Sequence, residues 1–104
     1  MNNINVIVDH NIPKHKLINR IDNFIKQEKN KFEDKVRDFK LSWEEDTANV
    51  SGKIMGNKID AKIHVEDSQV SVQGHLPLLA LGFKSKIEDE IREKLISLTN
   101  YSFQ

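Results

Sequence analysis

The chain has 104 residues, enough for one domain with one hydrophobic core and too few for two. Its 16 Lys and Arg residues are balanced by 16 Asp and Glu residues, whereas nucleic-acid binding needs a surplus of clustered positive charge, so we expect no nucleic-acid partner. Cysteine is absent, which excludes disulfides, thiolate metal sites and cysteine nucleophiles.

The first expected elements are a short strand and a long helix. Ile4, Val6 and Val8 alternate with Asn5, Ile7 and Asp9, which predicts a short strand with one clearly apolar face. Asn11 is suited to capping a helix, and Pro13 fits a first helical turn. Apolar residues at helical spacing then predict a helix over residues 13–34.

Four strands joined by short turns are expected next, from a change to period two. Their apolar faces are formed by Phe39, Leu41 and Trp43; Ala48, Val50, Gly52 and Ile54; Ile59, Ala61, Ile63 and Val65; and Val70, Val72 and Gly74. Gly56 and Asn57 tolerate the positive φ of a tight hairpin between the second and third of these strands. Short turns make neighbouring strands antiparallel, and one apolar face per strand predicts a sheet covered on one side only. The first strand can lie beside the last strand or beside the second.

The last expected element is a long amphipathic C-terminal helix. Its apolar stripe recurs at spacings of four and three residues and consists of Leu79, Phe83, Ile87, Ile91, Leu95 and Leu98. The apolar side of the sheet supplies the surface that this stripe needs. The sequence therefore predicts a single α+β domain over residues 1–104, with the order β-α-β-β-β-β-α and two helices covering one face of an antiparallel sheet.

The start of this helix is more apolar than one buried face requires. If Leu79 and Phe83 face the sheet, then Leu78 and Leu81 point sideways or outwards, with Leu76 beside them. One interpretation packs these residues under the first helix or in a homodimer interface. The other makes them an exposed apolar patch for a lipid-like or polymer surface.

No catalytic or metal-binding pattern stands out. His10 and His15 bracket the start of the first helix beside Asp9, but a metal site needs three converging ligands. His64 and His75 fall on polar strand faces. The phosphate-loop, serine-hydrolase and zinc-protease patterns do not occur. We therefore expect no enzyme, no cofactor and no bound metal.

A hydrophobic-ligand carrier is an alternative. Trp43 lies on an apolar strand face, where a core aromatic is favoured over a platform for stacking a ligand. In the alternative, a helix-grip arrangement encloses a pocket between the sheet and the long helix, lined by Trp43, Ile63 and Phe83. The sequence shows neither the pattern of a signal peptide nor an apolar run of roughly 20 residues, the length that spans a bilayer. We therefore expect a cytoplasmic protein without a transmembrane segment.

Two features resemble a known family. Asp9-His10 ends the first strand, and the chain closes with VEDSQVSVQGHLPLLALGFKSKIEDEIREKL, an alternating strand, an apolar helix start and an acidic–basic helix. Together with the order of elements, they resemble the polyhydroxyalkanoic acid system proteins of bacteria over nearly the whole chain. The resemblance implies no established catalytic activity and an association with polyhydroxyalkanoate storage granules or their synthesis machinery.

The resemblance also suggests what the apolar helix start binds. Leu76, Leu78 and Leu81 would contact the granule surface or a granule protein. Besides the ligand carrier, a homodimeric or partner-binding module is the remaining alternative.

Overall fold

The structure is a computed structural model that describes residues 4–100, except for the side chains of residues 78–80. Its elements are β1 (Ile4–Asp9), α1 (Lys14–Phe32), β2 (Arg37–Glu44), β3 (Thr47–Ile54), β4 (Asn57–Val65), β5 (Gln69–His75), the 3₁₀ helix η1 (Leu78–Phe83) and α2 (Lys84–Thr99). The predicted α+β order is confirmed. The apolar start of the last helix forms η1, a 3₁₀ segment, before the α-helix begins.

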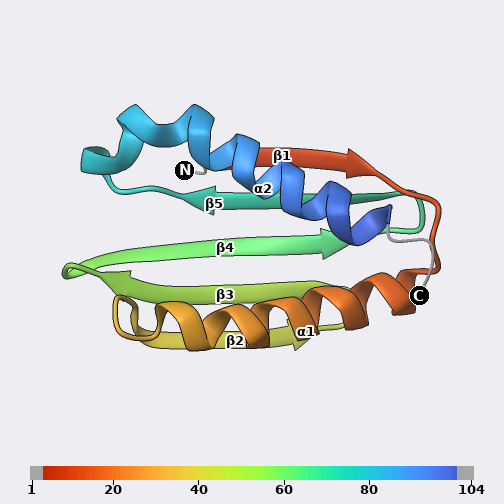
Figure 1. The fold of residues 1–104 in the computed structure, drawn as a ribbon, viewed down its shortest axis with the longest axis horizontal. Helices are drawn as coiled ribbons and strands as arrows, with labels where there is room; N and C mark the ends of the chain where they lie inside the picture. Colours follow the sequence, from red (N-terminus) through yellow and green to blue (C-terminus); the bar gives the residue numbers. More distant parts are fainter. Residues whose placement is uncertain (1–3, 101–104) are drawn as a thin grey trace.

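The five strands form one antiparallel sheet in the order β1-β5-β4-β3-β2. The first strand therefore lies beside the last, which decides between the two positions that the sequence left open. Both helices lie on the same face, where α1 overlies β2 and β3 and α2 overlies β1 and β5 (Figure 1). The other face of the sheet carries the polar residues of each strand.

The packed core lies at one end of the sheet, where the start of α1 and the end of α2 come together (Figure 1). The Arg20 guanidinium links the helices there by donating a hydrogen bond to the Leu98 carbonyl at 2.7 Å. The buried cluster consists of Val6, Leu17, Ile21, Val65, Val70, Val72 and Leu95. Burying each such side chain contributes roughly 1.5–3 kcal/mol. We call this the closed end.

The turn between β1 and α1 is organised by His10 and not by Asn11. The α1 helix has Pro13 as its cap residue, with no capping side chain, and the Pro13 carbonyl accepts from the amides of Lys16 and Leu17. His10 bonds the Glu66 carbonyl through Nε2 at 2.8 Å and accepts the Ile12 amide at Nδ1. The imidazole therefore joins this turn to the turn between β4 and β5, which explains a histidine directly after the strand.

The free edge of β1 is partly covered by α2. The backbone N–H of Asn5 donates to the Glu88 carboxylate at 3.0 Å. An exposed strand edge offers such N–H groups to other strands, so this contact removes one of them from the edge.

Candidate functional site

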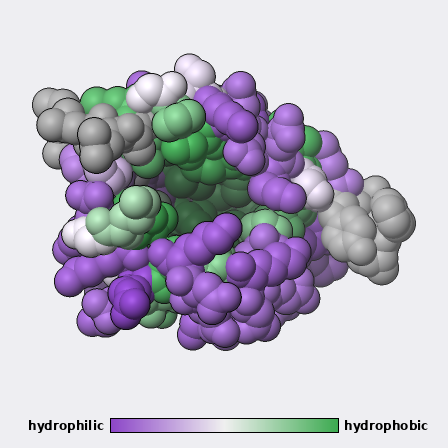
Figure 2. Space-filling model, turned by 60° about the vertical axis from the view of Figure 1, so that its left-hand side comes forward, coloured by the Kyte–Doolittle hydropathy of each residue, from purple (hydrophilic) through white to green (hydrophobic). Residues whose placement is uncertain are grey.

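The two helices diverge away from the closed end (Figure 1). A groove lies over the middle of the sheet and is lined by residues of both helices. The groove has a volume of about 1080 Å³ and a mostly apolar lining. Figure 2 looks into this hollow, whose depth is hydrophobic and whose margins are largely hydrophilic. Ligand pockets measure roughly 300–1,000 Å³, so the groove is large for a chain of this length. We call this the open end.

The floor of the groove is low because small residues lie in the middle of the sheet. One cross-strand row contains Ile4, Gly74, Ala61, Val50 and Leu41. Its two central positions, Gly74 and Ala61, carry a hydrogen atom and a methyl group. A Cβ atom at Gly74 would come within 2.9 Å of the Asp60 carbonyl oxygen, so the backbone itself requires glycine here.

The walls come from both helices and from the segments around the β3–β4 hairpin. The apolar wall residues are Phe32, Val36, Phe39, Ile54, Met55, Ile59, Leu76, Pro77, Ile87 and Ile91. The rings of Phe32 and Phe39 meet edge to face with centroids 5.3 Å apart, which fixes the end of α1 to β2. The polar lining residues are Ser51, Asn57, Asp60, His75 and Glu90.

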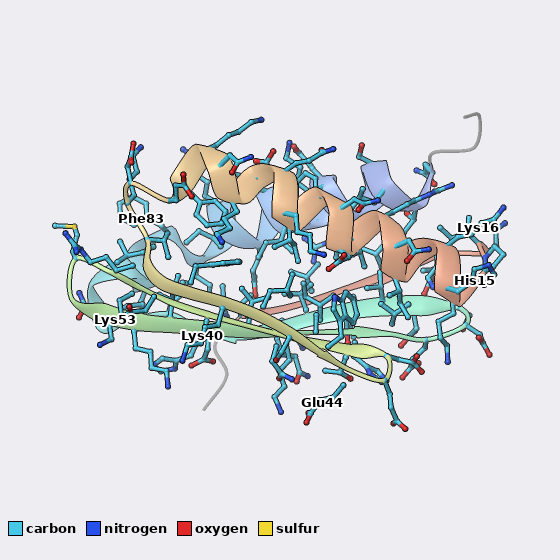
Figure 3. The ribbon with its side chains drawn as sticks, turned by 90° about the horizontal axis from the view of Figure 1, so that it is seen from below. His15, Lys16, Lys40, Glu44, Lys53 and Phe83 are labelled. Carbon is cyan, nitrogen blue, oxygen red and sulfur yellow. The ribbon has the colours of Figure 1, made fainter. Side chains whose placement is uncertain are left out.

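Although the margins of the groove are largely hydrophilic, four large apolar side chains are exposed on segments next to its lining, two in the β3–β4 hairpin and two in η1. They are Ile54 at 37%, Met55 at 93%, Leu81 at 38% and Phe83 at 63% exposed. Figure 3 shows Phe83 at the same end as Lys53, with His15 and Lys16 at the opposite end. We call these four residues the apolar rim. Such a cluster at one end of a small protein is typical of an interaction site.

The structure separates the residues that the sequence singled out. Leu76 lines the groove, and Leu81 is exposed in the apolar rim. The prediction for Leu78 concerns a side chain outside the described part of the structure. The side chain of Leu79, which the sequence placed in the apolar stripe, also lies outside the described part.

The expected pocket residues Trp43, Ile63 and Phe83 do not line the groove. Trp43 and Ile63 pack against the buried cluster at the closed end, as a core aromatic and its neighbour. The Trp43 indole N–H donates to the Asp22 carboxylate at 3.0 Å, so its polar atom is satisfied within the core layer. Phe83 does not line the groove and is 63% exposed in the apolar rim.

Sequence reasoning missed the exposed hairpin tip. Positive φ angles occur at Met55 (51°) and Gly56 (81°), one residue earlier than the predicted Gly56-Asn57. The available signal was a methionine directly before a glycine in a turn, where a polar residue is usual.

The closed end finishes in charged contacts. The Lys14 ammonium lies 2.9 Å from Asp46 and 3.9 Å from Asp67. The hydrogen bond to Asp46 raises the pKa of Lys14 above its ordinary value, partly offset by desolvation. His64 meets the Thr47 hydroxyl at 2.8 Å. Within residues 4–100, no group of three His, Asp or Glu side chains is placed to hold a metal ion.

The fold and the site therefore define a small α+β domain with an open hydrophobic groove. The chain belongs to the family described as "Putative polyhydroxyalkanoic acid system protein", whose family model matches residues 4–98 and confirms the resemblance. Neither the curated proteins nor the solved structures contain a match to this chain. None of the described helices has the length and apolarity to cross a membrane.

Proposed function

We propose that this protein is a non-enzymatic component of the polyhydroxyalkanoate storage system that binds the hydrophobic granule surface with its open end. The observation that carries the proposal is the apolar groove with the exposed apolar rim around its mouth. Membership in the polyhydroxyalkanoic acid system family supports the link to storage granules.

The chemistry of the groove suits an aliphatic polyester. Such a polymer presents hydrocarbon side chains and ester carbonyls, with no charge. The walls offer aliphatic and aromatic surface, while Asn57, opposite Ile54 on the groove side of the sheet, is the neutral polar side chain that can donate to an ester carbonyl. The ion pairs of Lys14 with Asp46 and Asp67 lie at the closed end, away from the groove.

Sedimentation with isolated granules tests the proposal. The variant Leu81→Glu with Phe83→Glu places two charges in the apolar rim, at residues that are already exposed, so neither charge enters the buried core. We expect the wild type to pellet and this variant to lose at least about tenfold in affinity, because apolar contact at the surface is replaced by buried charge.

The matched control is Ile7→Glu with Ile96→Glu. These residues are 50% and 40% exposed, and they lie outside the rim and the groove lining, so the control makes the same chemical change elsewhere. Circular dichroism establishes that both variants are folded. Equal pelleting of the rim variant and the wild type, or equal loss in the control, contradicts the proposal.

The same experiment addresses protein partners and self-association. If the apolar rim forms a homodimer interface, the mass in solution depends on concentration and falls in the rim variant. If it binds a granule protein, granules stripped of protein no longer pellet the wild type.

A second candidate, a hydrophobic-ligand carrier, is favoured by the volume and concavity of the groove. The variant Ala61→Leu fills the floor without adding charge or changing the rim. A carrier predicts saturable binding of a fluorescent fatty acid that Ala61→Leu abolishes. A surface binder predicts that Ala61→Leu still pellets with granules.

A further inference from the structure

A row of three basic residues crosses the outer face of the sheet, on the side opposite the groove. In the register of β2, β3 and β4, Arg37 lies opposite Lys53 and Lys53 lies opposite Lys58. Directly opposite residues of an antiparallel pair share one face, and like charges there are destabilising. Figure 3 shows Lys53 and Lys40 on the side of the sheet away from the helices. We call Arg37, Lys53 and Lys58 the basic row.

Acidic residues neutralise this row only in part. Asp38 lies 3.9 Å from Lys53, at the limit of an ion pair, and both side chains are more than half exposed. Among the residues that the structure describes, the contact between Lys53 and Asp38 is the one ion pair that a member of the basic row makes. Repulsion among the three positive charges does not stabilise the fold. Binding of a negatively charged partner therefore accounts for the basic row better than internal stability does.

An apolar tip projects beyond the basic row. Met55 is 93% exposed and holds a positive φ of 51°, a backbone region that a methionine adopts at a cost. Hairpin turns with two positive φ angles strongly favour Asn-Gly, whereas this turn has Met55-Gly56. A residue that is unfavourable both for the turn and for hydration indicates selection for contact at the tip.

The spacing of these two features matches a lipid surface. Met55 stands two residues beyond Lys53 in the chain, and a strand rises about 3.3 Å per residue, so the basic row lies roughly 7 Å behind the tip. Apolar groups at a lipid interface reach about 5–10 Å into the boundary between headgroups and acyl chains. A protein partner would require a broad apolar contact area, which the polar outer face around the basic row does not offer.

We propose that the β3–β4 tip docks on an anionic phospholipid layer, with Met55 among the acyl chains and the basic row on the phosphates. The inference rests on the proposed function for the orientation of the molecule, with its open end towards the surface. It shares Met55 with the apolar rim but uses neither the groove floor nor the η1 residues Leu81 and Phe83 that the granule test changes, so the two proposals can fail separately.

Vesicle flotation at low salt tests the inference. We expect the full chain to bind vesicles of phosphatidylcholine mixed with phosphatidylglycerol and to bind phosphatidylcholine vesicles weakly. Each basic residue near an anionic surface contributes about fivefold in affinity, so Lys53→Gln with Lys58→Gln should weaken binding roughly 25-fold. The control Lys16→Gln with Lys94→Gln removes the same charge at the closed end and should leave binding unchanged.

The variant Met55→Asn separates the role of the tip from folding. Because Asn suits the first position of this turn, the variant should unfold at a higher temperature than the wild type. It should nevertheless lose roughly tenfold in vesicle affinity, since an apolar side chain no longer enters the layer.

Several outcomes overturn the inference. They are no binding of the wild type to the mixed vesicles, equal loss in the Lys16 and Lys94 control, and unchanged affinity of Met55→Asn. Binding to lipid-free polyester granules without binding to vesicles overturns this inference and leaves the proposed function standing. Binding to vesicles without binding to granules overturns the proposed function and leaves this inference standing.

Discussion

Two neighbouring cross-strand rows of side chains on the helix-covered face of the sheet differ in burial. At the closed end, Trp43, Ala48, Ile63, Val72 and Val6 lie side by side across the strands under converging helices. One row further along, Gly74 and Ala61 occupy the central positions and the helices have separated, so the apolar surface faces a groove (Figure 1). A continuous apolar face therefore becomes either packed core or the floor of an open groove, according to side-chain volume and the spread of the helices.

The largest expected difference between the two ends concerns truncation of buried side chains. Leu17 is fully buried at the closed end, and Leu17→Ala should cost about 3 kcal/mol in the free energy of unfolding. Ile87 is half-buried in the groove wall, and Ile87→Ala should cost about 1 kcal/mol because solvent already reaches it. Urea denaturation measures both values, and equal costs would mean that the groove is as well packed as the core.

The same enlargement should have opposite effects in the two rows. Ala48 is fully buried between Trp43 and Ile63, so Ala48→Leu should destabilise the protein by about 2 kcal/mol through overpacking. Ala61→Leu places its added carbons in the groove and should stabilise by up to about 1 kcal/mol. Thermal and urea unfolding of the pair checks the signs. Destabilisation by Ala61→Leu would show that its surroundings have no room.

The smallest expected effect concerns Asp22, which ties α1 to the closed end. The hydrogen bond from Lys26 lowers the pKa of Asp22, burial opposes this shift, and the Trp43 indole adds to it. A lowered pKa means that the ionised carboxylate stabilises the fold above the ordinary pKa of 3.8 and that this contribution disappears as the pH falls through the lowered value.

We therefore expect Asp22→Asn to cost about 1 kcal/mol at neutral pH, the size of one hydrogen-bonded contact. The gap between wild type and variant should close in strongly acidic solution. Unfolding curves across the acid range provide the test, and a gap that widens as the pH falls would contradict this assignment.

Sequence periodicity predicted the elements well because each strand buries one face. The alternation in residues 58–65 and the short turns were enough for a meander, and β4 spans Asn57–Val65. Periodicity reports which face of an element is apolar, but not how much surface lies opposite. The last helix shows this, because its stripe looks uniform in sequence while Leu95 is buried, Ile87 is half-buried and Phe83 is 63% exposed.

The groove and the basic row were hidden from the sequence for a related reason. Both depend on strand register and helix direction, which bring residues such as Arg37 and Lys58 onto one line from distant positions. The alternative of a pocket under the long helix anticipated an apolar site, but it placed that site near Trp43. The apolar strand face favoured Trp43 as a core aromatic, and Trp43 does pack against the buried cluster, but the sequence did not show at which end of the sheet the helices converge.

The contact between the Glu88 carboxylate and the Asn5 amide affects how molecules of this protein behave at high local concentration. Molecules gathered on a surface meet at high local concentration, where open strand edges join neighbours into growing sheets. On one edge of this sheet the helix carboxylate occupies a backbone donor. On the other, β2 is interrupted by an irregularity between Arg37 and Lys40, and such bulges bend an edge away from regular pairing. Both edges therefore hinder the addition of further strands, so a dense layer of the protein on the proposed granule surface would not polymerise through its sheet edges.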